Sequence, residues 1–418
     1  MGGSARLSPL RQAGLAVVLL LGACTIIPPS GPAGQRPPPT APAAPPSAPK
    51  PPATALLTGV VPGPAPASLS LGSARAGAAL RSFVESCRSL LARTDASGLT
   101  RPADWQPACG AAPTWPATDA AGFFTRYFET VRVGDGRAYV TGYYEPEIAG
   151  SRVKAPGFEV PVYRLPPDLV RAWPFETPFD QRTGQPPLGR FDAQGKFVPY
   201  YDRAAIEDGA LAGKGLELAW AADPIELFFL EIQGSGRLLA PDGTVMRIGY
   251  AGQNGLPYTG IGQVMRDRGL IGTGPGQYPG SMQGIMAWLR ANPEEGRALM
   301  RSNRSVVFFR EITGDGPIGA MGVPVRPQAS LAADPLMVPL GAPVWLATDR
   351  AETTGLWVAQ DTGGAIKGPN RFDSFWGAGP TARQIAGGMS AKGDALLLVP
   401  VGTLARLAGT GASTAARK

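Results

Sequence analysis

Residues Val358 to Gly377 read VAQDTGGAIKGPNRFDSFWG, and this stretch sets two aspartates, Asp361 and Asp373, between apolar runs. Asp361 opens an Asp-Thr-Gly triplet, which aspartic proteases use to hold a catalytic carboxylate. A protease of that class with two lobes in one chain needs a second triplet, and the sequence contains none. The stretch therefore predicts a site built on aspartates that is not a peptidase site.

The sequence on either side predicts a compact barrel of short strands. Runs rich in β-branched and aromatic residues are separated by Gly and Pro turns at fairly even spacing. These runs are SVVFFRE (305–311), APVWLAT (342–348), GLWVAQDT (355–362) and DALLLVPVG (394–402). The pattern does not alternate strands with helices, as a parallel α/β sheet would.

Apolar periodicity predicts the other elements. Helices are expected over 74–93, 119–131, 281–290 and 293–300, and strands over 139–148 and 225–232. Thr118 is a plausible cap for the second helix, and Pro293 suits a first helical position. The segment IELFFLEI (225–232) is the clearest buried strand, and the strand over 139–148 is expected to end in a turn at 143–146.

Three aspartates lie in distinctive settings, namely Asp334 in LAADPLMVPLG, Asp361 in AQDTGGAIKG and Asp373 in NRFDSFWG. Each is followed by turn or glycine residues, which places it near a strand end, where a site can be built on a rigid frame. A single aspartate of this kind is most often a turn residue. The three together favour a functional site.

Aromatic residues flank Asp373, since Phe372 precedes it and Phe375 and Trp376 follow. Apolar walls disfavour the charged form of a carboxyl group and raise its pKa, as a general acid requires. Such rings also suit stacking on sugars. Packing of the same rings in the core, without any role in the site, is the alternative.

Composition excludes several kinds of chemistry. The chain has no histidine, which removes most nucleophile–base triads, common zinc sites and histidine bases. Asp, Glu, Lys and Tyr remain for acid–base work. The net charge of +7 is consistent with an anionic polymer partner. The sequence lacks the basic cluster interleaved with aromatic residues that would indicate binding to nucleic acid. No metal or other cofactor is expected.

The N-terminal region predicts export. Residues 1–23 form a signal peptide, because their apolar core is shorter than the ~20 residues that a membrane-spanning helix needs. The segment Leu21-Gly22-Ala23-Cys24 matches the bacterial lipobox, in which Cys24 is acylated; an ordinary cleavage site is the alternative. Thr25, in place of Asp, favours the outer membrane by resemblance to lipoprotein sorting. Residues 24–70 then form a Pro- and Ala-rich linker.

Two further cysteines, Cys87 and Cys109, form an even pair in an exported chain. An oxidising compartment favours a disulfide between them. Two buried free thiols are the alternative.

Several segments resemble signatures of the MltA-type lytic transglycosylases. The stretch LAADPLMVPLG … VAQDTGGAIKGPNRFDSFWG resembles the three-aspartate domain of that family. Other similar segments are TGYYEPEIAGSR (141–152), PVYRLPPDL (161–169), FFLEIQGSGRL (228–238), YAGQNGLPYTGIG (250–262) and SMQGIMAWLRANP … NRSVVFF (281–309). They follow the order of the family from about residue 75 to residue 403.

The resemblance implies a mainly β fold with some α, in which a double-psi β-barrel domain carries a smaller inserted β domain and a groove lies between them. The implied segments are the barrel domain at 71–149 and 309–405, its three-aspartate part at about 325–403, the insert at 150–308 and a flexible tail at 406–418.

The resemblance also implies the activity. The family cleaves the β-1,4 bond between N-acetylmuramic acid and N-acetylglucosamine in peptidoglycan and leaves a 1,6-anhydro end. Asp373 matches the catalytic general acid/base, and Asp361 and Asp334 are expected to support it, the latter as a turn residue. The expected substrate contacts are Thr141, Tyr143, Glu145, Gln233 and Ser235. For Tyr143, its neighbour Tyr144 and Glu145, a structural turn is equally compatible.

The expected setting is an outer-membrane lipoprotein facing the periplasm. Its partners would be peptidoglycan strands, membrane lipid through Cys24 and a possible wall-remodelling complex. Two alternatives stay open. One is a hydrolytic glycosidase that pairs Asp373 with Asp361 or Glu145, and the other is a glycan-binding lipoprotein without catalysis.

Overall fold

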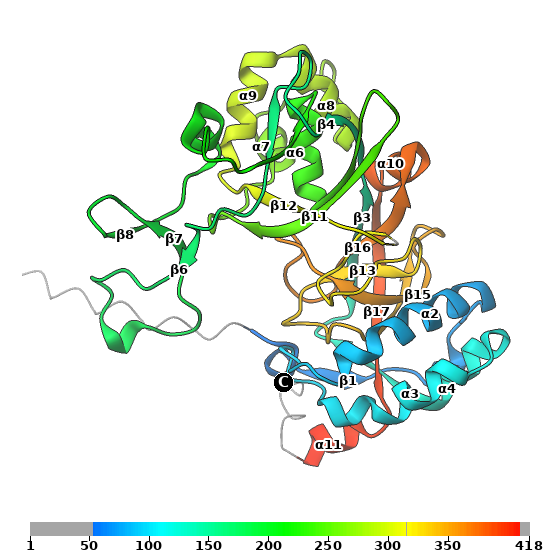
Figure 1. Cartoon of the computed structure of the whole chain (residues 1–418). Coiled ribbons are helices and arrows are strands. Elements are labelled where there is room, and N and C mark those ends of the chain that lie inside the picture. Colours follow the sequence, from blue (N-terminus) through cyan, green and yellow to red (C-terminus); the bar gives the residue numbers. More distant parts are fainter. Residues whose placement is uncertain (1–52, 315, 410–418) are drawn as a thin grey trace, which may run out of the picture. The chain divides into compact units, whose positions relative to one another are not determined.

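The computed structural model describes residues 53–314 and 316–409 (Figure 1). The expected signal peptide, Cys24, residues 24–52 of the expected linker and residues 410–418 of the expected tail lie outside these residues. The expected linker bound of 70 is wrong, because residues 55–62 already form a short helix and a strand that pairs with the first sheet. The tail expected from residue 406 is also wrong at its start, because a helix continues to Gly409. Within the described part of the chain, no helix combines the length and hydropathy needed to cross a membrane.

Eight strands form the first sheet, in the order β1-β2-β17-β14-β15-β13-β16-β3. They are β1 (Val60–Pro62), β2 (Phe128–Val133), β3 (Arg137–Glu145), β13 (Ser330–Ala333), β14 (Pro343–Thr348), β15 (Gly355–Asp361), β16 (Arg371–Ala378) and β17 (Ser390–Pro400). Because β3 pairs with β17 as well as with β16, six of these strands close into a barrel. The pairs β13–β15 and β16–β3 are parallel, and the other pairs in the barrel are antiparallel.

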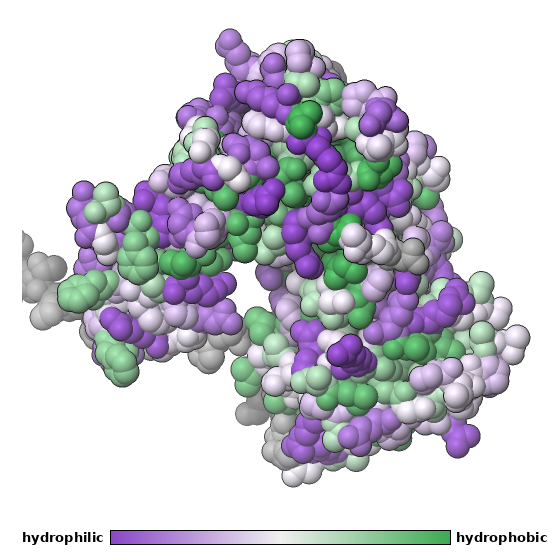
Figure 2. Space-filling view, in the orientation of Figure 1, coloured by the Kyte–Doolittle hydropathy of each residue, from purple (hydrophilic) through white to green (hydrophobic). Residues whose placement is uncertain are grey.

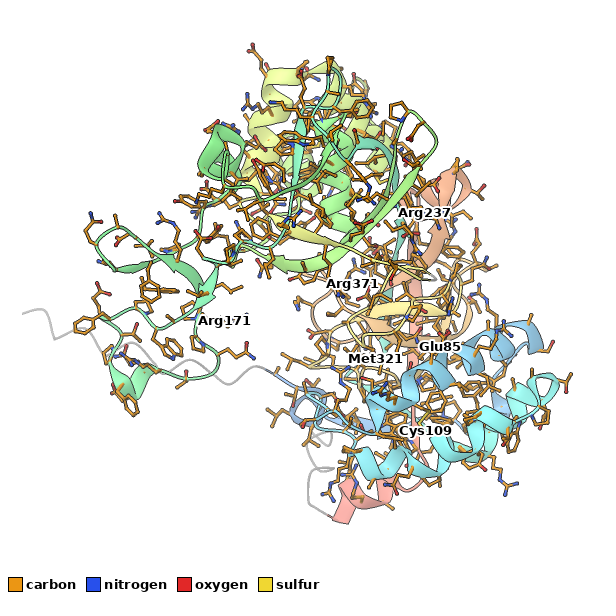
Figure 3. All side chains as sticks on the ribbon, in the orientation of Figure 1. Glu85, Cys109, Arg171, Arg237, Met321 and Arg371 are labelled. Atoms are coloured by element: carbon orange, nitrogen blue, oxygen red, sulfur yellow. A yellow bond between two sulfur atoms is a disulfide. The ribbon has the colours of Figure 1, made fainter. Side chains whose placement is uncertain are left out.

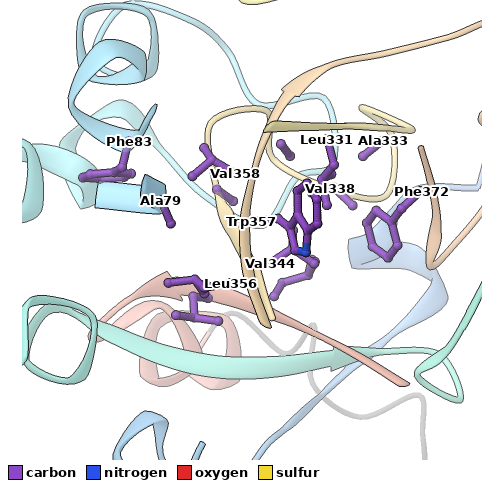
Figure 4. Packing of buried hydrophobic residues seen from close by; sticks show 14 of the residues in the cluster. Ala79, Phe83, Leu331, Ala333, Val338, Val344, Leu356, Trp357, Val358 and Phe372 are labelled. Atoms are coloured by element: carbon purple, nitrogen blue, oxygen red, sulfur yellow. The ribbon is translucent and has the colours of Figure 1, made fainter. Parts of the chain in front are cut away.

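The barrel strands are apolar because their side chains are buried on both faces. Trp357, Leu331 and Phe372 have no exposed surface and belong to one core cluster (Figure 4). The helices α2 (Ser73–Leu90), α3 (Gln106–Ala111) and α4 (Ala120–Tyr127) add side chains to the same cluster. Cys87 of α2 and Cys109 of α3 form a disulfide, as expected for an exported chain.

A second sheet of six strands lies in the segment from β4 to β12, residues 147–311, here called the insert. Its order is β12-β11-β10-β4-β9-β5. The strands are β4 (Glu147–Ser151), β5 (Val160–Tyr163), β9 (Glu217–Ala221), β10 (Ser235–Leu239), β11 (Val245–Gln253) and β12 (Val307–Glu311). Only Pro146 separates β3 of the barrel from β4, so one extended segment serves both sheets. The expected fold class, mainly β with a barrel and an inserted β part, is confirmed.

The insert also carries helices and a small sheet. The helices are α5 (Arg203–Ala205), α6 (Pro224–Gln233), α7 (Ile261–Asp267), α8 (Met282–Ala291) and α9 (Pro293–Ser302). The small sheet joins β6 (Val170–Arg171), β7 (Leu188–Phe191) and β8 (Phe197–Val198). Figure 2 shows hydrophobic spots over this segment, where Phe175 and Phe179 are 93% and 87% exposed. Besides α2, α3 and α4, the described part of the chain outside the insert contains the helices α1 (Ala55–Thr58), α10 (Gly379–Gly387) and α11 (Thr403–Gly409).

The prediction of a strand over 225–232 is wrong, because these residues form helix α6. Asp223 caps the helix by accepting hydrogen bonds from Ile225 N and Glu226 N, and Pro224 occupies the first turn. Gly234 ends the helix in the left-handed conformation. An apolar run of this length fits a buried helix as well as a strand, and the two end signals decide for the helix.

Two other boundaries differ from expectation. The helix expected over 119–131 ends at Tyr127, and Phe128 already begins β2; its N-terminal cap position is held by Asp119 and not by Thr118. The turn expected at 143–146 is also wrong, because β3 continues through Glu145. The strand is interrupted only at Pro146, which cannot donate a hydrogen bond to a neighbouring strand.

Candidate active site

One face of β3 organises the polar residues of the barrel. Side chains on a strand alternate between its two faces, so Tyr139, Thr141, Tyr143 and Glu145 share a face. Each of these four side chains contacts a charged partner from another strand. The site is therefore assembled along a single strand.

Asp373 lies on β16 directly beside Thr141 of β3 in the parallel pair. The Thr141 hydroxyl donates to Asp373 Oδ1 at 2.7 Å, and Arg371 Nη2 donates to Thr141 Oγ1 at 3.0 Å (Arg371 is labelled in Figure 3). Burial raises the pKa of Asp373 to about 6, while the Thr141 bond and the Arg371 charge lower it and the Asp361 charge raises it further. Asp373 as a whole residue keeps partial exposure, while its carboxyl group lies in a desolvated environment.

Asp361 ends β15, and both of its carboxylate oxygens accept hydrogen bonds. Oδ1 accepts from Ala320 N at 3.0 Å and Thr362 N at 2.9 Å, and Oδ2 accepts from the Tyr143 hydroxyl at 3.1 Å. Burial raises the pKa of Asp361 to about 6, and these three donors oppose the rise. Asp361 is thus held by neutral donors in a fixed orientation.

Tyr143 connects the two aspartates. Its ring packs against Phe375 with the ring centroids 5.0 Å apart, and only 8% of its surface is exposed. Burial raises the pKa of Tyr143 well above its usual value, and the charges of Asp361 and Asp373 add to the rise. The hydroxyl therefore stays protonated and donates to Asp361.

Asp334 follows β13 and fixes two loops. Its Oδ1 accepts from Leu336 N at 3.1 Å and its Oδ2 accepts from Gly368 N at 2.8 Å, and the side chain is 4% exposed. These bonds tie the turn after β13 to the loop between Asp361 and Asp373. The geometry supports the turn role that the sequence suggests for Asp334.

Glu145 is almost fully buried and holds two arginines of the insert. Its Oε2 accepts from Arg237 Nε at 3.0 Å and its Oε1 accepts from Arg247 Nη2 at 3.0 Å, while 1% of the residue is exposed (Arg237 is labelled in Figure 3). Arg237 also pairs with Glu147. Both carboxylate oxygens of Glu145 are paired with arginines and almost none of the residue is exposed, so the geometry favours a structural role over the expected substrate contact.

The structure also places the two expected contacts from the segment QGSG. Gln233 ends α6 and its Oε1 accepts from Tyr144 N at 3.0 Å, which joins the insert to β3. Ser235 begins β10 and pairs with Gly249 of β11. Gln233 is thus brought to β3, and Ser235 is placed two residues beyond it.

The aromatic residues around Asp373 are mostly core residues. Phe372 and Phe375 are 0% and 1% exposed, and Trp376 packs against Trp357 with the ring centroids 6.0 Å apart. Of the three rings, Phe375 lies two residues from Asp373 on the same face of β16 and packs with Tyr143, whereas Phe372 and Trp376 belong to the barrel core. All three are too deeply buried to stack on a sugar, so that expectation is wrong.

Sequence reasoning missed Arg371 and Tyr258. Arg371 lies two residues before Asp373, and this spacing on a strand puts both side chains on one face. Tyr258 lies in the loop of the insert before α7 and is 37% exposed. Burial raises the pKa of Tyr258, and the Asp373 charge raises it further while the Arg203 charge opposes the rise, so Tyr258 interacts electrostatically with that carboxylate. Nothing local in the sequence indicates this long-range approach.

A cavity of about 760 Å³ lies elsewhere, inside the insert between β5, β9 and α6. Its walls include Val162, Trp220 and Phe228, and none of the three aspartates lines it. The cavity therefore does not mark the site of the carboxylates. Across residues 53–314 and 316–409, no group of three or more Cys, His, Asp or Glu side chains is arranged to hold a metal ion.

Comparison with known proteins adds family information to this geometry. The model of the MltA specific insert domain matches residues 139–310, and the model of the 3D domain matches residues 329–399. The membrane-bound lytic murein transglycosylase A of Vibrio cholerae is 33% identical over 263 residues, which is 60% of this chain and 62% of that protein. The chain thus aligns with less than two thirds of this relative.

Two solved structures are similar over most of the chain. MltA from Neisseria gonorrhoeae is 36% identical with a TM-score of 0.64, covering 82% of this chain and 97% of that one. Escherichia coli MltA with bound chitohexaose is 26% identical with a TM-score of 0.57, covering 82% and 94%. These matches define a barrel protein that carries an MltA specific insert before a 3D domain. The chain belongs to the MltA family.

Proposed function

We propose that the protein is a peptidoglycan lytic transglycosylase. It would cleave the β-1,4 bond between N-acetylmuramic acid and N-acetylglucosamine and leave a 1,6-anhydro-N-acetylmuramic acid end. The observation that carries this proposal is the setting of Asp373, a partly exposed residue whose Oδ1 accepts a hydrogen bond from Thr141 and whose carboxyl pKa is raised to about 6. The names of the relatives and the chitohexaose bound to the E. coli protein support the same substrate class.

Asp373 would act first as an acid and then as a base. A pKa of about 6 leaves a useful fraction of the acid form near neutral pH. The acid protonates the oxygen of the leaving sugar as the C1–O bond breaks, and the C6 hydroxyl of the same muramic acid attacks C1. Asp373 then takes the proton of that hydroxyl. An internal nucleophile has a high effective molarity, so no water and no second carboxylate are required.

The setting of Asp361 favours this mechanism over hydrolysis by a carboxylate pair. A hydrolase needs one acid and one free base or nucleophile. Asp361 accepts three hydrogen bonds on its two oxygens, and Glu145 is held by two arginines. We propose that Asp361 orients Tyr143 and raises the pKa of Asp373, and that Asp334 only fixes the loops.

The other parts of the proposal concern the setting. The barrel domain, expected at 71–149 and 309–405, would also include β1 (Val60–Pro62), and the insert domain, expected at 150–308, would extend over residues 147–311. Cys24 would carry lipid and hold the protein at the outer membrane, facing the periplasm. Peptidoglycan strands would be the main partner, within a possible wall-remodelling complex.

Mass spectrometry of the fragments that the full chain releases from purified sacculi tests the proposal. We expect products that end in the anhydro sugar. Products heavier by one water would instead make the protein a hydrolase. Binding to sacculi without any released product would make it a glycan-binding protein.

A further inference from the structure

Two neighbouring cross-strand pairs surround one oxygen of Asp373. Arg371 of β16 lies beside Tyr139 of β3, and Asp373 lies beside Thr141 in the same register. The Arg371 guanidinium covers the Tyr139 ring at 5.0 Å from its centroid and also donates to Phe372 O. Arg371 is therefore fixed from two sides, and its Nη2 is aimed at Thr141 Oγ1.

The direction of the hydrogen bonds follows from what each group can do. A guanidinium only donates, while a threonine hydroxyl has one proton and two lone pairs. Since Arg371 N–H points at Thr141 Oγ1, the Thr141 proton turns toward the carboxylate, and Asp373 Oδ1 accepts it at 2.7 Å. A proton placed on Oδ1 would leave the Thr141 hydroxyl without its acceptor.

We infer that Thr141 and Arg371 are positioning residues which keep Asp373 Oδ1 as a permanent acceptor and reserve Oδ2 for proton transfer to and from the substrate. This inference rests on the proposed role of Asp373. Thr141 is thereby assigned a positioning role in place of the substrate contact that the sequence suggested. Arg371, for which the sequence suggested no role, is assigned a positioning role as well.

The arrangement suits both halves of the reaction. Within the described part of the chain, no protein donor forms a hydrogen bond with Asp373 Oδ2. When Asp373 is an acid, the proton sits on Oδ2 and the Oδ1 carbonyl still accepts from Thr141. After Oδ2–H has passed to the leaving sugar oxygen, Oδ2 is free to take the proton of the C6 hydroxyl. The Thr141 bond stays in place in both states, so the carboxyl group does not turn during the cycle.

Other charged and titratable groups near Asp373 come from three neighbouring elements. They are Asp361 at the end of β15, Tyr143 on β3 and Tyr258 in the insert. Of the interactions that shift the pKa of Asp373, the Thr141 hydrogen bond and the Arg371 charge are the two that lower it. Removing either one should therefore move the pH profile of the enzyme in a known direction.

Substitution at Thr141 gives the sharpest test. In Thr141→Val, which keeps the shape and removes the hydroxyl, we expect kcat to fall by about 10- to 100-fold, as for a misplaced catalytic group, with little change in KM. The descending limb of the pH–rate profile should move to higher pH because the pKa of Asp373 rises. Thr141→Ser restores the hydroxyl and should return both the rate and the limb close to those of the natural enzyme.

Arg371→Met should act in the same direction as Thr141→Val. Because Arg371 works largely through Thr141, the loss in the double variant should be far smaller than the product of the two single losses. Binding of chitohexaose and a thermal melt on every variant separate these effects from misfolding.

The outcomes are distinguishable. Variants that lose activity without any shift of the limb, or a serine variant no better than the valine one, would overturn the inference and leave a structural role. Natural enzyme that releases no anhydro product would instead overturn the proposed function.

Discussion

Two acidic clusters lie along the same face of β3 and differ in what holds them. Glu145 is paired with Arg237 and Arg247, so each carboxylate oxygen meets a cation. Four residues earlier, Thr141 contacts Asp373 with a neutral hydroxyl, and Tyr143 does the same for Asp361. Burial raises the pKa of Asp361 and of Asp373 to about 6, so these two carboxyl groups, which accept from neutral donors, can exchange a proton near neutral pH. One strand thus carries a structural cluster and a chemical one.

The largest expected effect is loss of turnover in Asp373→Asn. An amide cannot donate a proton as an acid does, so activity on sacculi should fall by at least the ~10²–10⁴-fold that general acid catalysis contributes. Binding of chitohexaose should persist. Retention of more than a small fraction of the activity would remove Asp373 from its proposed role and erase the difference between the two clusters.

Substitution in the structural cluster around Glu145 should lower the free energy of unfolding. Glu145→Gln leaves two arginines without their carboxylate, and breaking a buried pair in this way costs ~3–5 kcal/mol. The side chain of Arg237 is 34% exposed, so we expect the free energy of unfolding to fall by a smaller amount, about 2 kcal/mol. Unfolding in denaturant measures this change. Glu311→Gln is the matched control, because its pair with Arg152 is exposed and worth at most ~1 kcal/mol. Equal losses in the two variants would contradict the structural role of Glu145.

Asp361→Asn should reduce activity by about 10-fold at neutral pH, less than Asp373→Asn, because it disturbs the setting of the acid and not the acid itself. The Asp361 charge raises the pKa of Asp373. Its removal should therefore move the descending limb to lower pH, opposite to Thr141→Val. If Asp361→Asn matched Asp373→Asn at every pH and kept its fold, the two residues would have to be treated as a catalytic dyad.

The smallest expected effect is on thermal stability. The pKa of Asp373 is about 6 in the folded protein and lies above its usual 3.8, so proton binding stabilises the fold. That stability is complete below about 3.8 and is lost as the pH rises through 6. Asp373→Asn should thus melt about 1–3 °C above the natural protein at pH 8, and this difference should shrink by pH 5. A difference that stays constant between the two pH values would mean that burial does not disfavour the charge of Asp373.

The sequence predicts the barrel better than the insert. Strands β14, β15 and β17 are continuous apolar runs between Gly and Pro turns, and such runs are easy to find. Helix α6 is equally apolar but short, so its period does not separate it from a strand, and only Asp223-Pro224 and Gly234 mark its ends. The end of α4 at Tyr127 depends on the pairing of β2 with β17, which no local pattern contains.

The residues of the site also differ in how well the sequence predicts them. Asp334, Asp361 and Asp373 stand out because they follow or occupy strands and resemble a known signature. The roles of their neighbours depend on which strands become adjacent. The sequence alone could not show that Thr141 reaches Asp373, that Arg371 reaches Thr141 or that Glu145 is enclosed by arginines from the insert.

The position of β3 in the chain has a consequence for biogenesis. Thr141 and Asp373 are 232 residues apart, and β3 gains its partners only when β16 and β17 are present. The strands of the second sheet, by contrast, all lie between residues 147 and 311 and can pair earlier. Barrels closed by distant segments have high contact order and fold slowly. Asp373 therefore meets Thr141 only late in folding, and an incomplete nascent chain carries no assembled site.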